Sequence, residues 1–416
     1  MDPVHGFIVV GERWILDLVG TPEFQRLRRI RQLGASYATY HGAEHTRFGH
    51  CLGAFHIMRT ILRRLEHAGS PVDEGTRTAA LAAALLHDLG HGPLSHSLEG
   101  ELTPGRGHEA WTLDILQGPT RVAAVLQALD PSLPGLVADI LQRRYPLPWV
   151  SHLVSGQLDV DRMDYLLRDA LFTGTGYGRY ELDRIVHTLV LAGGRVVVLA
   201  KGLHAAEEYL LARYFMYWRV YLHKTTRALE CMLRQAFRRA RELWSAGRLP
   251  AEAVGRFAPF FAGRGSVAEY LALDDHDAFW ALKGWASAPD PVLADLARRI
   301  LDRDFLKPVF KEPQPDLDEA AIERAREVVA AGGWDPDHYC LVDRTGNVPY
   351  DAYAGGSAAR TDPILVLDGS GRLEEISRVS PLIGSLSGRR LEAVNLYVPE
   401  PCREQVRGAL RRLGLY

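Results

Sequence analysis

A series of metal-ligand residue types, spaced widely along the chain, constrains its fold more than any other feature. His50 is followed by the doublet His87-Asp88 and later by Asp161. Imidazole nitrogens and carboxylate oxygens together suit a divalent transition metal, and four protein ligands leave room for water or a phosphate oxygen. The doublet ends an apolar run over 79–86, and the glycines and proline just after it predict the end of a helix. We therefore expect the ligands at the mouth of a buried helix.

Histidines also crowd the first part of the chain, where ten of the sixteen lie within the first 108 residues. Histidines with only surface or capping roles would not gather in this way. Imidazole exchanges protons near neutral pH, so we expect at least one of His91, His96 and His108 to act as a general acid. Glu99 is near enough in sequence to orient such a histidine, and the alternative is hydrogen bonding without chemistry.

A helix that follows Asp159 is expected to present a polar wall. Asp161, Tyr165 and Asp169 share one face at helical spacing, with Arg162 beside it. A solvated helix face is the alternative interpretation, because charged helices are common.

Composition narrows the class of protein. The 416 residues are 47% apolar and 24% charged with a net charge of −2, so no global basic field predicts broad nucleic-acid or membrane-surface binding. Arg47 and Arg213 add local positive charge that suits a phosphorylated substrate. Because the four cysteines are far apart and no secretory or membrane-spanning apolar segment is found, we expect a cytoplasmic protein.

Hydrophobic periodicity predicts a mainly α protein with a helical core over 1–304 and a smaller α+β lobe over 305–416. A strand is expected over 196–199, and residues 344–362 are expected to form an exposed loop. The helices predicted in the core cover 23–33, 50–65, 76–88, 109–116, 122–128, 136–142, 150–172 and 203–243. In the lobe, strands are predicted at 309–310, 339–342, 364–367 and 393–398, and helices at 317–331 and 400–413.

Four stretches carry a resemblance to a known family. They are FQRLRRIRQLG (24–34), RFGHCLG (47–53), HDLGHGPLSH (87–96) and DVDRMDYLLRD (159–169). In the order of these stretches and in the residues within each, the chain resembles the HD-domain phosphohydrolases over about residues 5–230. Among these it is most similar to the deoxynucleoside triphosphate triphosphohydrolases. The C-terminal lobe resembles that of bacterial members, through sequence motifs that are less distinctive.

The resemblance implies hydrolysis of a dNTP to a deoxynucleoside and inorganic triphosphate, with one divalent metal ion (Mn, Fe, Ni, Zn, Co or Mg). His96 would be the proton donor to the sugar 5′-oxygen. The implied metal ligands are His50, His87, Asp88 and Asp161, and the residues that would organise His96 are His91, His108 and Glu99. The residues that would hold the triphosphate are Arg47, Arg162 and Arg213, and those that would line the deoxyribose pocket are Gln32, Leu33, Tyr165 and Asp169, with Tyr221 near the sugar and base.

Some positions depart from the family pattern. Glu99 stands where vertebrate relatives carry aspartate, and Tyr217 stands where histidine is expected, one turn before Tyr221. Gln25 and Arg28 match a nucleotide-sensing pair of regulated relatives, although the acidic partner expected just upstream is absent. An activating nucleotide at this pair is therefore a hypothesis, as is assembly into a homodimer or homotetramer, which the resemblance implies.

Two other functions remain open from the sequence. The first is a different HD-type phosphohydrolase that acts on nucleoside monophosphates, cyclic nucleotides or alarmones. The second is a non-catalytic nucleotide sensor or nucleic-acid-binding module, for which an arginine patch such as 26–31 could serve although the net charge argues against it.

Overall fold

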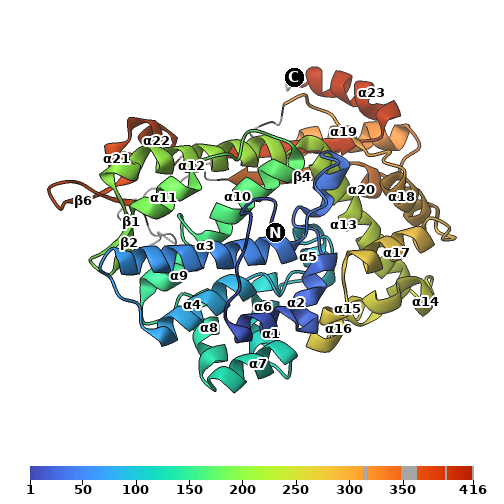
Figure 1. Cartoon of the computed structure of the whole chain (residues 1–416). Coiled ribbons are helices and arrows are strands. Elements are labelled where there is room, and N and C mark those ends of the chain that lie inside the picture. The colour runs from blue at the N-terminus through green and yellow to red at the C-terminus, as the bar shows by residue number, and fades with distance from the viewer. Residues whose placement is uncertain (313, 315–316, 348–362, 389–390, 415–416) are drawn as a thin grey trace.

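The computed structural model describes residues 1–312, 314, 317–347, 363–388 and 391–414 (Figure 1). The chain is 61% helical with 8% strand. This confirms the prediction of a mainly α fold, a helical core with a small C-terminal region that contains few strands.

The helix α3 (Arg47–His67) runs through the middle of the molecule (Figure 1). It packs against α4 (Glu74–Leu86) on one side and α10 (Val160–Thr173) on the other. The Asp73 side chain caps α4 by accepting a hydrogen bond from the backbone N–H of Thr76 (2.8 Å). Every residue over 79–86 is buried, so the alanine-rich run is core as predicted.

Shorter helices surround this centre in chain order. They are α1 (Arg13–Val19), α2 (Pro22–Arg26), α5 (His96–Leu102), α6 (His108–Gln117), α7 (Arg121–Leu129), α8 (Leu133–Leu141), α9 (Pro148–Ser155), α11 (Leu182–Thr188) and α12 (Leu203–Met216). A second group gathers around α13 (Lys224–Ser245) and comprises α14 (Ala251–Val254), α15 (Ala258–Phe261), α16 (Val267–Leu271), α17 (Asp275–Trp285) and α18 (Pro291–Leu301).

The helix predicted over 23–33 is wrong beyond its first turns. The α-helix α2 ends at Arg26, a 3₁₀ turn follows over Leu27–Arg29, and Ile30 is extended (φ −121°, ψ 115°). Arg31 pairs with Thr46 in a β-bridge, and the N–H of Gln32 donates to the carbonyl of His45 (2.9 Å). The backbone therefore gains partners in the segment before α3 that a continued helix could not offer.

Two long predicted helices are each broken. Residues 150–172 divide into α9 and α10, because Asp159 is extended and its side chain caps α10 at the N–H of Arg162 (2.8 Å). Residues 203–243 divide into α12, a π-helical turn over Tyr217–Tyr221 and α13, which His223 caps. π-helical turns occur often at functional sites, and both tyrosines that bound this one line the cavity described below.

Two small sheets complete the fold. The first has the order β1-β2-β5-β6, with β1 (Leu189–Ala192), β2 (Arg195–Leu199), β5 (Leu365–Leu367) and β6 (Leu373–Glu375). The second has the order β3-β7-β4, with β3 (Lys307–Pro308), β4 (Leu341–Asn347) and β7 (Leu391–Val398). The strand predicted over 196–199 is present in β2, whereas the one predicted at 309–310 is wrong, because the strand lies just before it, as β3. Residues 344–347 lie in β4 rather than in a loop, and 348–362 lie outside the described residues.

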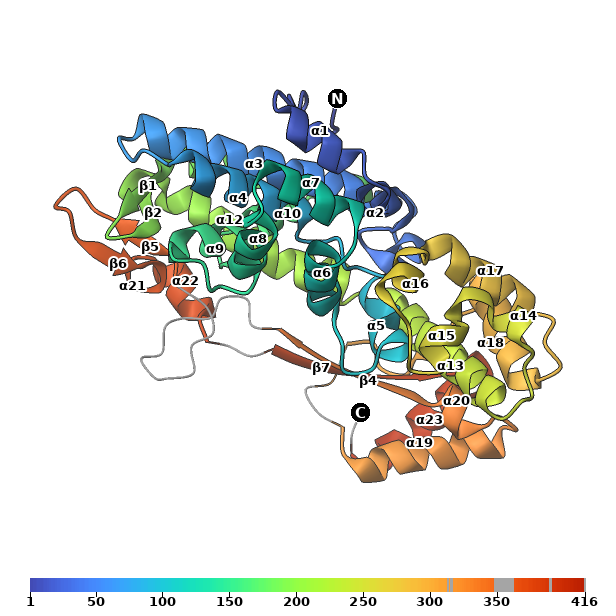
Figure 2. The same ribbon diagram turned by 90° about the horizontal axis from the view of Figure 1, so that it is seen from below.

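Residues beyond 305 pack both against the helices around α3 and against those around α13. The parallel pairing of β5 with β2 carries Ile364 and Val366 into the core around α3. Figure 2 shows β5, β6, α21 (Ile376–Val379) and α22 (Pro381–Leu386) at one end. At the other end lie α19 (Glu319–Ala331), α20 (Pro336–Tyr339) and α23 (Glu400–Arg411). Buried side chains of these helices and of α13 belong to one hydrophobic cluster. The predicted division between residues 304 and 305 stays a prediction.

Among the described residues, no single helix has the length and apolar character needed to cross a membrane. One pair of helices, α7 and α8, meets that length and composition together but is bent by 112°.

Leu85 in α4 tests the importance of this core. Its side chain is fully buried, so we expect Leu85→Ala to lower the free energy of unfolding by about 2–5 kcal/mol. Leu129→Ala at the exposed end of α7 is the control and should change it by less than about 0.5 kcal/mol. Chemical denaturation measures both, and equal effects would contradict the placement of α4 at the centre.

Candidate active site

Three side chains from three helices bring possible metal ligands together. His50 lies in the first turn of α3, His87 caps the C-terminal end of α4, and Asp161 lies in the first turn of α10. Their donor atoms lie within 4.8 Å of one another. The Nε2 atom of His50 is 3.1 Å from Nε2 of His87 and 3.1 Å from Oδ1 of Asp161. These separations fit a ligand set around one cation with bonds of about 2.0–2.2 Å.

The other ring nitrogens of the two histidines are already engaged. Nδ1 of His50 lies 2.8 Å from Oδ2 of Asp164, and Nδ1 of His87 lies 2.9 Å from the carbonyl oxygen of Ala84. Each ring can therefore donate through Nδ1 and keep the lone pair of Nε2 for a metal. The residues present thus fit a divalent cation.

Asp88, the fourth predicted ligand, lies beside this cluster. Its oxygens are 3.5 Å from Nε2 of His87 and 3.7 Å from Nε2 of His50. Its Oδ2 atom also accepts a hydrogen bond from Nη1 of Arg47 (2.5 Å), and both side chains are buried. Arg47 therefore contributes charge next to the cluster, and Asp88 shares its carboxylate between the arginine and the histidines.

The site polarises its own groups. Burial alone would raise the pKa of Asp161, but hydrogen bonds from His50 and His87 hold it below its ordinary value. Burial alone would lower the pKa of His50, but hydrogen bonds with Asp161 and Asp164 raise it to about 10. The carboxylates thus favour positive charge at the point where a cation would sit.

A second cluster contains the three predicted catalytic histidines. The rings of His91 and His108 stack with centroids 3.9 Å apart, and the ring of His96 lies 5.0 Å from that of His91. Glu99 reaches two of these rings, because Nδ1 of His96 and Nδ1 of His108 each lie 3.0 Å from one of its oxygens. The glutamate therefore makes both contacts despite its departure from the family pattern. Burial lowers the pKa of His91 well below its ordinary value and keeps that ring neutral.

The turn before His96 is strained. Leu94 (φ 52°) and Ser95 (φ 51°) have positive φ angles, which non-glycine residues rarely adopt. Asp275 of α17 accepts a hydrogen bond from the N–H of Leu94 (2.8 Å), and Oγ of Ser95 accepts one from Nε of Arg47 (3.0 Å). Strain held by such contacts is common where a side chain must be aimed, here His96.

One cavity of about 400 Å³ joins these clusters. The lining residues that the sequence predicted are Gln32, Leu33, Arg47, Asp88, His91, His96, His108, Asp161, Tyr165, Asp169, Tyr217 and Tyr221. His50 is completely buried behind the lining, and Glu99 supports two of the histidines.

The tyrosine side of the cavity is closely connected. The hydroxyl of Tyr221 donates to Oδ2 of Asp169 (2.8 Å), whose Oδ1 lies 2.7 Å from Nε2 of His45. The ring of Tyr165 meets that of Tyr221 edge-on at 6.1 Å and lies 6.4 Å from the ring of His50. Tyr165 therefore lies between His50 of the metal-ligand cluster and Tyr221.

Two predicted phosphate-binding arginines lie near Tyr165 but are not among the residues that line the cavity. Arg162 bonds instead to Asp159 and to the carbonyl of Gly156 (2.6 Å). Arg213 is buried, and its Nε and Nη1 atoms have no hydrogen-bond partner among the described residues. An unpaired buried guanidinium costs free energy, so an anion is the ligand that would satisfy it.

The predicted sensing pair lies apart from this cavity. Nε of Arg28 donates to Oε1 of Gln25 (2.8 Å), and the Arg28 guanidinium lies over the ring of Phe48, 3.5 Å from its centroid. Neither side chain lines the cavity. A nucleotide-sensing role for the pair stays a prediction.

Several residues of the site were not singled out by the sequence. Arg227 and Glu230 of α13 line the cavity, and Asp343 of β4 accepts two hydrogen bonds from Arg227 (2.6 and 2.9 Å). Asp164 is fully buried against His50. Its place one helical turn after Asp161 was the available signal, whereas nothing local links Arg227 to Asp343.

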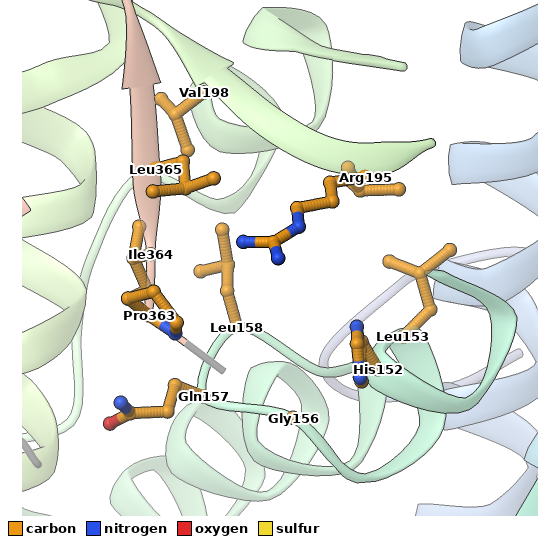
Figure 3. A pocket seen from close by; sticks show the side chains of 11 residues that line it. His152, Leu153, Gly156, Gln157, Leu158, Arg195, Val198, Pro363, Ile364 and Leu365 are labelled. Atoms are coloured by element: carbon orange, nitrogen blue, oxygen red, sulfur yellow. The ribbon is translucent and has the colours of Figure 1, made fainter. Parts of the chain in front are cut away.

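Figure 3 shows a different hollow, between α9, β2 and β5. Arg195 and His152 are its charged or titratable lining residues, and most of the others are apolar. Among the described residues that line it there is no set of metal ligands, whereas Asp88, Asp161 and three histidines line the cavity above.

Metal binding to the His50 cluster should depend on pH. A proton and a metal ion compete for Nε2 of His50, and with its pKa raised to about 10 the ring holds a proton at neutral pH. We expect the affinity for Mn²⁺ or Co²⁺ to rise about tenfold per unit between about pH 6 and 8. Isothermal titration calorimetry in buffers of different ionisation enthalpy would also show the released proton. An affinity independent of pH would contradict this electrostatic account.

Comparisons with known proteins agree with the geometry. Residues 47–169 match the HD domain, and residues 181–413 match the HD associated region. A phosphohydrolase structure from Bacteroides thetaiotaomicron has a TM-score of 0.83 at 33% identity and covers 95% of this chain and 98% of its own. The Bacillus subtilis protein YwfO is 39% identical over 96% of this chain and 91% of its own length.

A more distant relative bears a more specific name. The Dictyostelium discoideum homolog of the deoxynucleoside triphosphate triphosphohydrolase SAMHD1 is 27% identical over 252 residues. The match covers 58% of this chain and 48% of that protein. The HD associated region alone matches more than half of the chain, and the near full-length likeness to YwfO agrees with it. The chain therefore belongs to the HD-domain family of phosphohydrolases.

Proposed function

We propose that the protein hydrolyses dNTPs to deoxynucleoside and inorganic triphosphate. The observation that carries this proposal is that one cavity is lined by three groups of side chains. They are the possible metal ligands Asp88 and Asp161, the histidines His91, His96 and His108, and the tyrosines Tyr165, Tyr217 and Tyr221. A nucleoside triphosphate needs these three features side by side, one for its reacting phosphate, one for its leaving group and one for its sugar.

The chemistry would take place at the α-phosphate. A divalent ion held by His50, His87, Asp88 and Asp161 would polarise the phosphate oxygens and lower the pKa of water. As water adds to the α-phosphorus it would lose a proton to solvent, while the bond from phosphorus to the 5′-oxygen would break and that oxygen would need a proton. His96 can supply it from Nε2, because Glu99 holds Nδ1 of the same ring at 3.0 Å.

The sugar would lie against Tyr165. The buried Oε1 atom of Gln32 has no hydrogen-bond partner among the described residues, so it can accept one from the 3′-hydroxyl. Asp169 lines the same part of the cavity and can contribute to that contact. The ring of Tyr165 would leave little room for a 2′-hydroxyl, which predicts discrimination against ribonucleotides.

The triphosphate would extend toward the arginines. Arg213 has two buried nitrogens without a hydrogen-bond partner in the described part of the chain, and Arg47 and Arg227 line the cavity. Arg162 would have to exchange its contact with Asp159 for a phosphate. Planar guanidinium groups suit the oxygens of such a chain.

The name of the Dictyostelium relative supports this substrate class over the other HD-type phosphohydrolase reactions. A nucleoside monophosphatase, a cyclic-nucleotide or alarmone hydrolase and a non-catalytic sensor remain the alternatives. Cytoplasmic location, assembly into a dimer or tetramer and activation by a nucleotide stay predictions.

Product analysis tests the reaction. The protein, reloaded with Mn²⁺, is incubated with each dNTP and with all four together, and the products are separated by ion exchange. We expect a deoxynucleoside and intact triphosphate, with turnover lost in Asp161→Ala and reduced about 10²–10⁴-fold in His96→Gln. Orthophosphate or pyrophosphate would assign one of the other hydrolase reactions. Turnover only in the mixture would support an activating nucleotide, and no turnover in any case would favour a sensor.

Tyr165→Ala tests the discrimination between sugars. Removal of the ring should raise kcat/KM for a ribonucleotide relative to the matching deoxyribonucleotide by about tenfold or more. Tyr177→Ala, at an exposed tyrosine that does not line the cavity, is the control and should leave the ratio unchanged. An unchanged ratio in Tyr165→Ala would place the sugar elsewhere.

A further inference from the structure

We propose that the N-terminal turn over residues 2–6 is a working part of the metal centre. In this arrangement His5 and Arg168 are positioning residues that hold Asp164, and Asp164 orients the metal ligand His50. This role rests on the metal site of the proposed function and not on the choice of substrate.

Asp164 receives four contacts, two at each oxygen. Its Oδ2 atom lies 2.8 Å from Nδ1 of His50 and accepts a hydrogen bond from Nε of Arg168 (2.8 Å). Its Oδ1 atom lies 2.6 Å from Nε2 of His5 and accepts a hydrogen bond from Nη2 of Arg168 (2.9 Å). The carboxylate of Asp164 therefore cannot rotate without losing a hydrogen bond to His5 or to Arg168.

The turn itself is held by Asp2. Its Oδ1 atom accepts hydrogen bonds from the backbone N–H groups of Val4 (2.9 Å) and His5 (3.1 Å), and its backbone pairs with Gly6. Both oxygens of Asp2 also accept hydrogen bonds from Arg168 (3.0 and 3.2 Å). Asp2 thus shapes the turn and anchors it to the same arginine that holds Asp164.

The network is largely buried and tightly fitted. The side chains of Asp164, His50 and Arg168 are at most 2% exposed, and that of His5 is 5% exposed. Gly53 of α3 faces Asp164, and a Cβ atom there would lie 1.8 Å from Oδ1. Water cannot replace a missing partner easily at such a site, so loss of His5 should be transmitted to the carboxylate.

A carboxylate on the far nitrogen of a ligating histidine fixes its tautomer and raises its basicity. Asp164 is placed to do this for His50, because Nε2 of the same ring points into the ligand cluster. The N-terminal turn is distant in sequence from every predicted ligand, yet it reaches this centre through the contacts of His5 with Asp164 and of Asp164 with His50.

His56 provides a matched control. Its ring lies 5.4 Å from the ring of His5, and both residues line the same hollow, which shares no lining residue with the cavity of the candidate active site. The hydrogen bonds described for Asp164 come from His5, His50 and Arg168, and none comes from His56. A general effect of packing in that hollow would appear in both histidine variants.

The test measures Co²⁺ binding to the full-length protein after metal removal, followed by the visible absorption of the bound ion, which reports ligand geometry. We expect His5→Ala to weaken Co²⁺ binding by about 10–100-fold and to change the spectrum. His5→Gln places an amide N–H where Nε2 lies and should recover most of the affinity. His56→Ala should bind as the unaltered protein does.

Wild-type affinity and spectrum in His5→Ala would overturn the role of the turn. So would an equal loss in His56→Ala, or a loss that His5→Gln does not reduce. If His5→Ala does not fold, as judged by circular dichroism of the metal-free protein, the comparison of His5→Gln with Asp164→Asn decides, since only the latter should lose affinity. The substrate plays no part in this measurement, so failure of the dNTP assay would leave its result intact.

Discussion

The charge of Asp164, buried between α3 and α10, is the constraint on which the rest of the site depends. Burial alone would raise the pKa of this carboxyl, but the Arg168 guanidinium and hydrogen bonds from His5 and His50 hold it well below its usual range. A buried charge without such partners would cost several kcal/mol. The contacts that pay this cost also set the distance between the two helices and the orientation of His50.

A carboxylate holds the imidazole rings of both histidine clusters of the site. Asp164 holds His50 from behind, and Glu99 holds His96 and His108. Burial alone would raise the pKa of Glu99, but hydrogen bonds from His108 and His96 bring it well below its ordinary value. In both places a charged oxygen engages one ring nitrogen, which fixes the tautomer of the ring and leaves its other nitrogen to serve a ligand.

Residues far apart in the chain complete the cavity. Arg227 of α13 enters its wall, and Asp343 of β4 holds that guanidinium with two hydrogen bonds. Asp275 of α17 supports the strained turn before His96. The segments after residue 270 are therefore connected to the site by charged contacts as well as by packing. The shape of the cavity thus depends on the position of strand β4, which holds Arg227.

The sequence alone determined the helical class and the buried alanine-rich helix, because helical periodicity is a local property of the chain. Through the resemblance of its short motifs to a known family, the sequence also predicted most residues of the cavity. It predicted the ligand types at His50, His87 and Asp161, which the fold brings within 4.8 Å. Only the tertiary structure decided where long helices break, since Ile30 and Asp159 leave helical geometry for partners that local patterns do not reveal. It also decided which charges support the ligands, because the contacts of Asp2, His5 and Asp343 join residues more than a hundred positions apart.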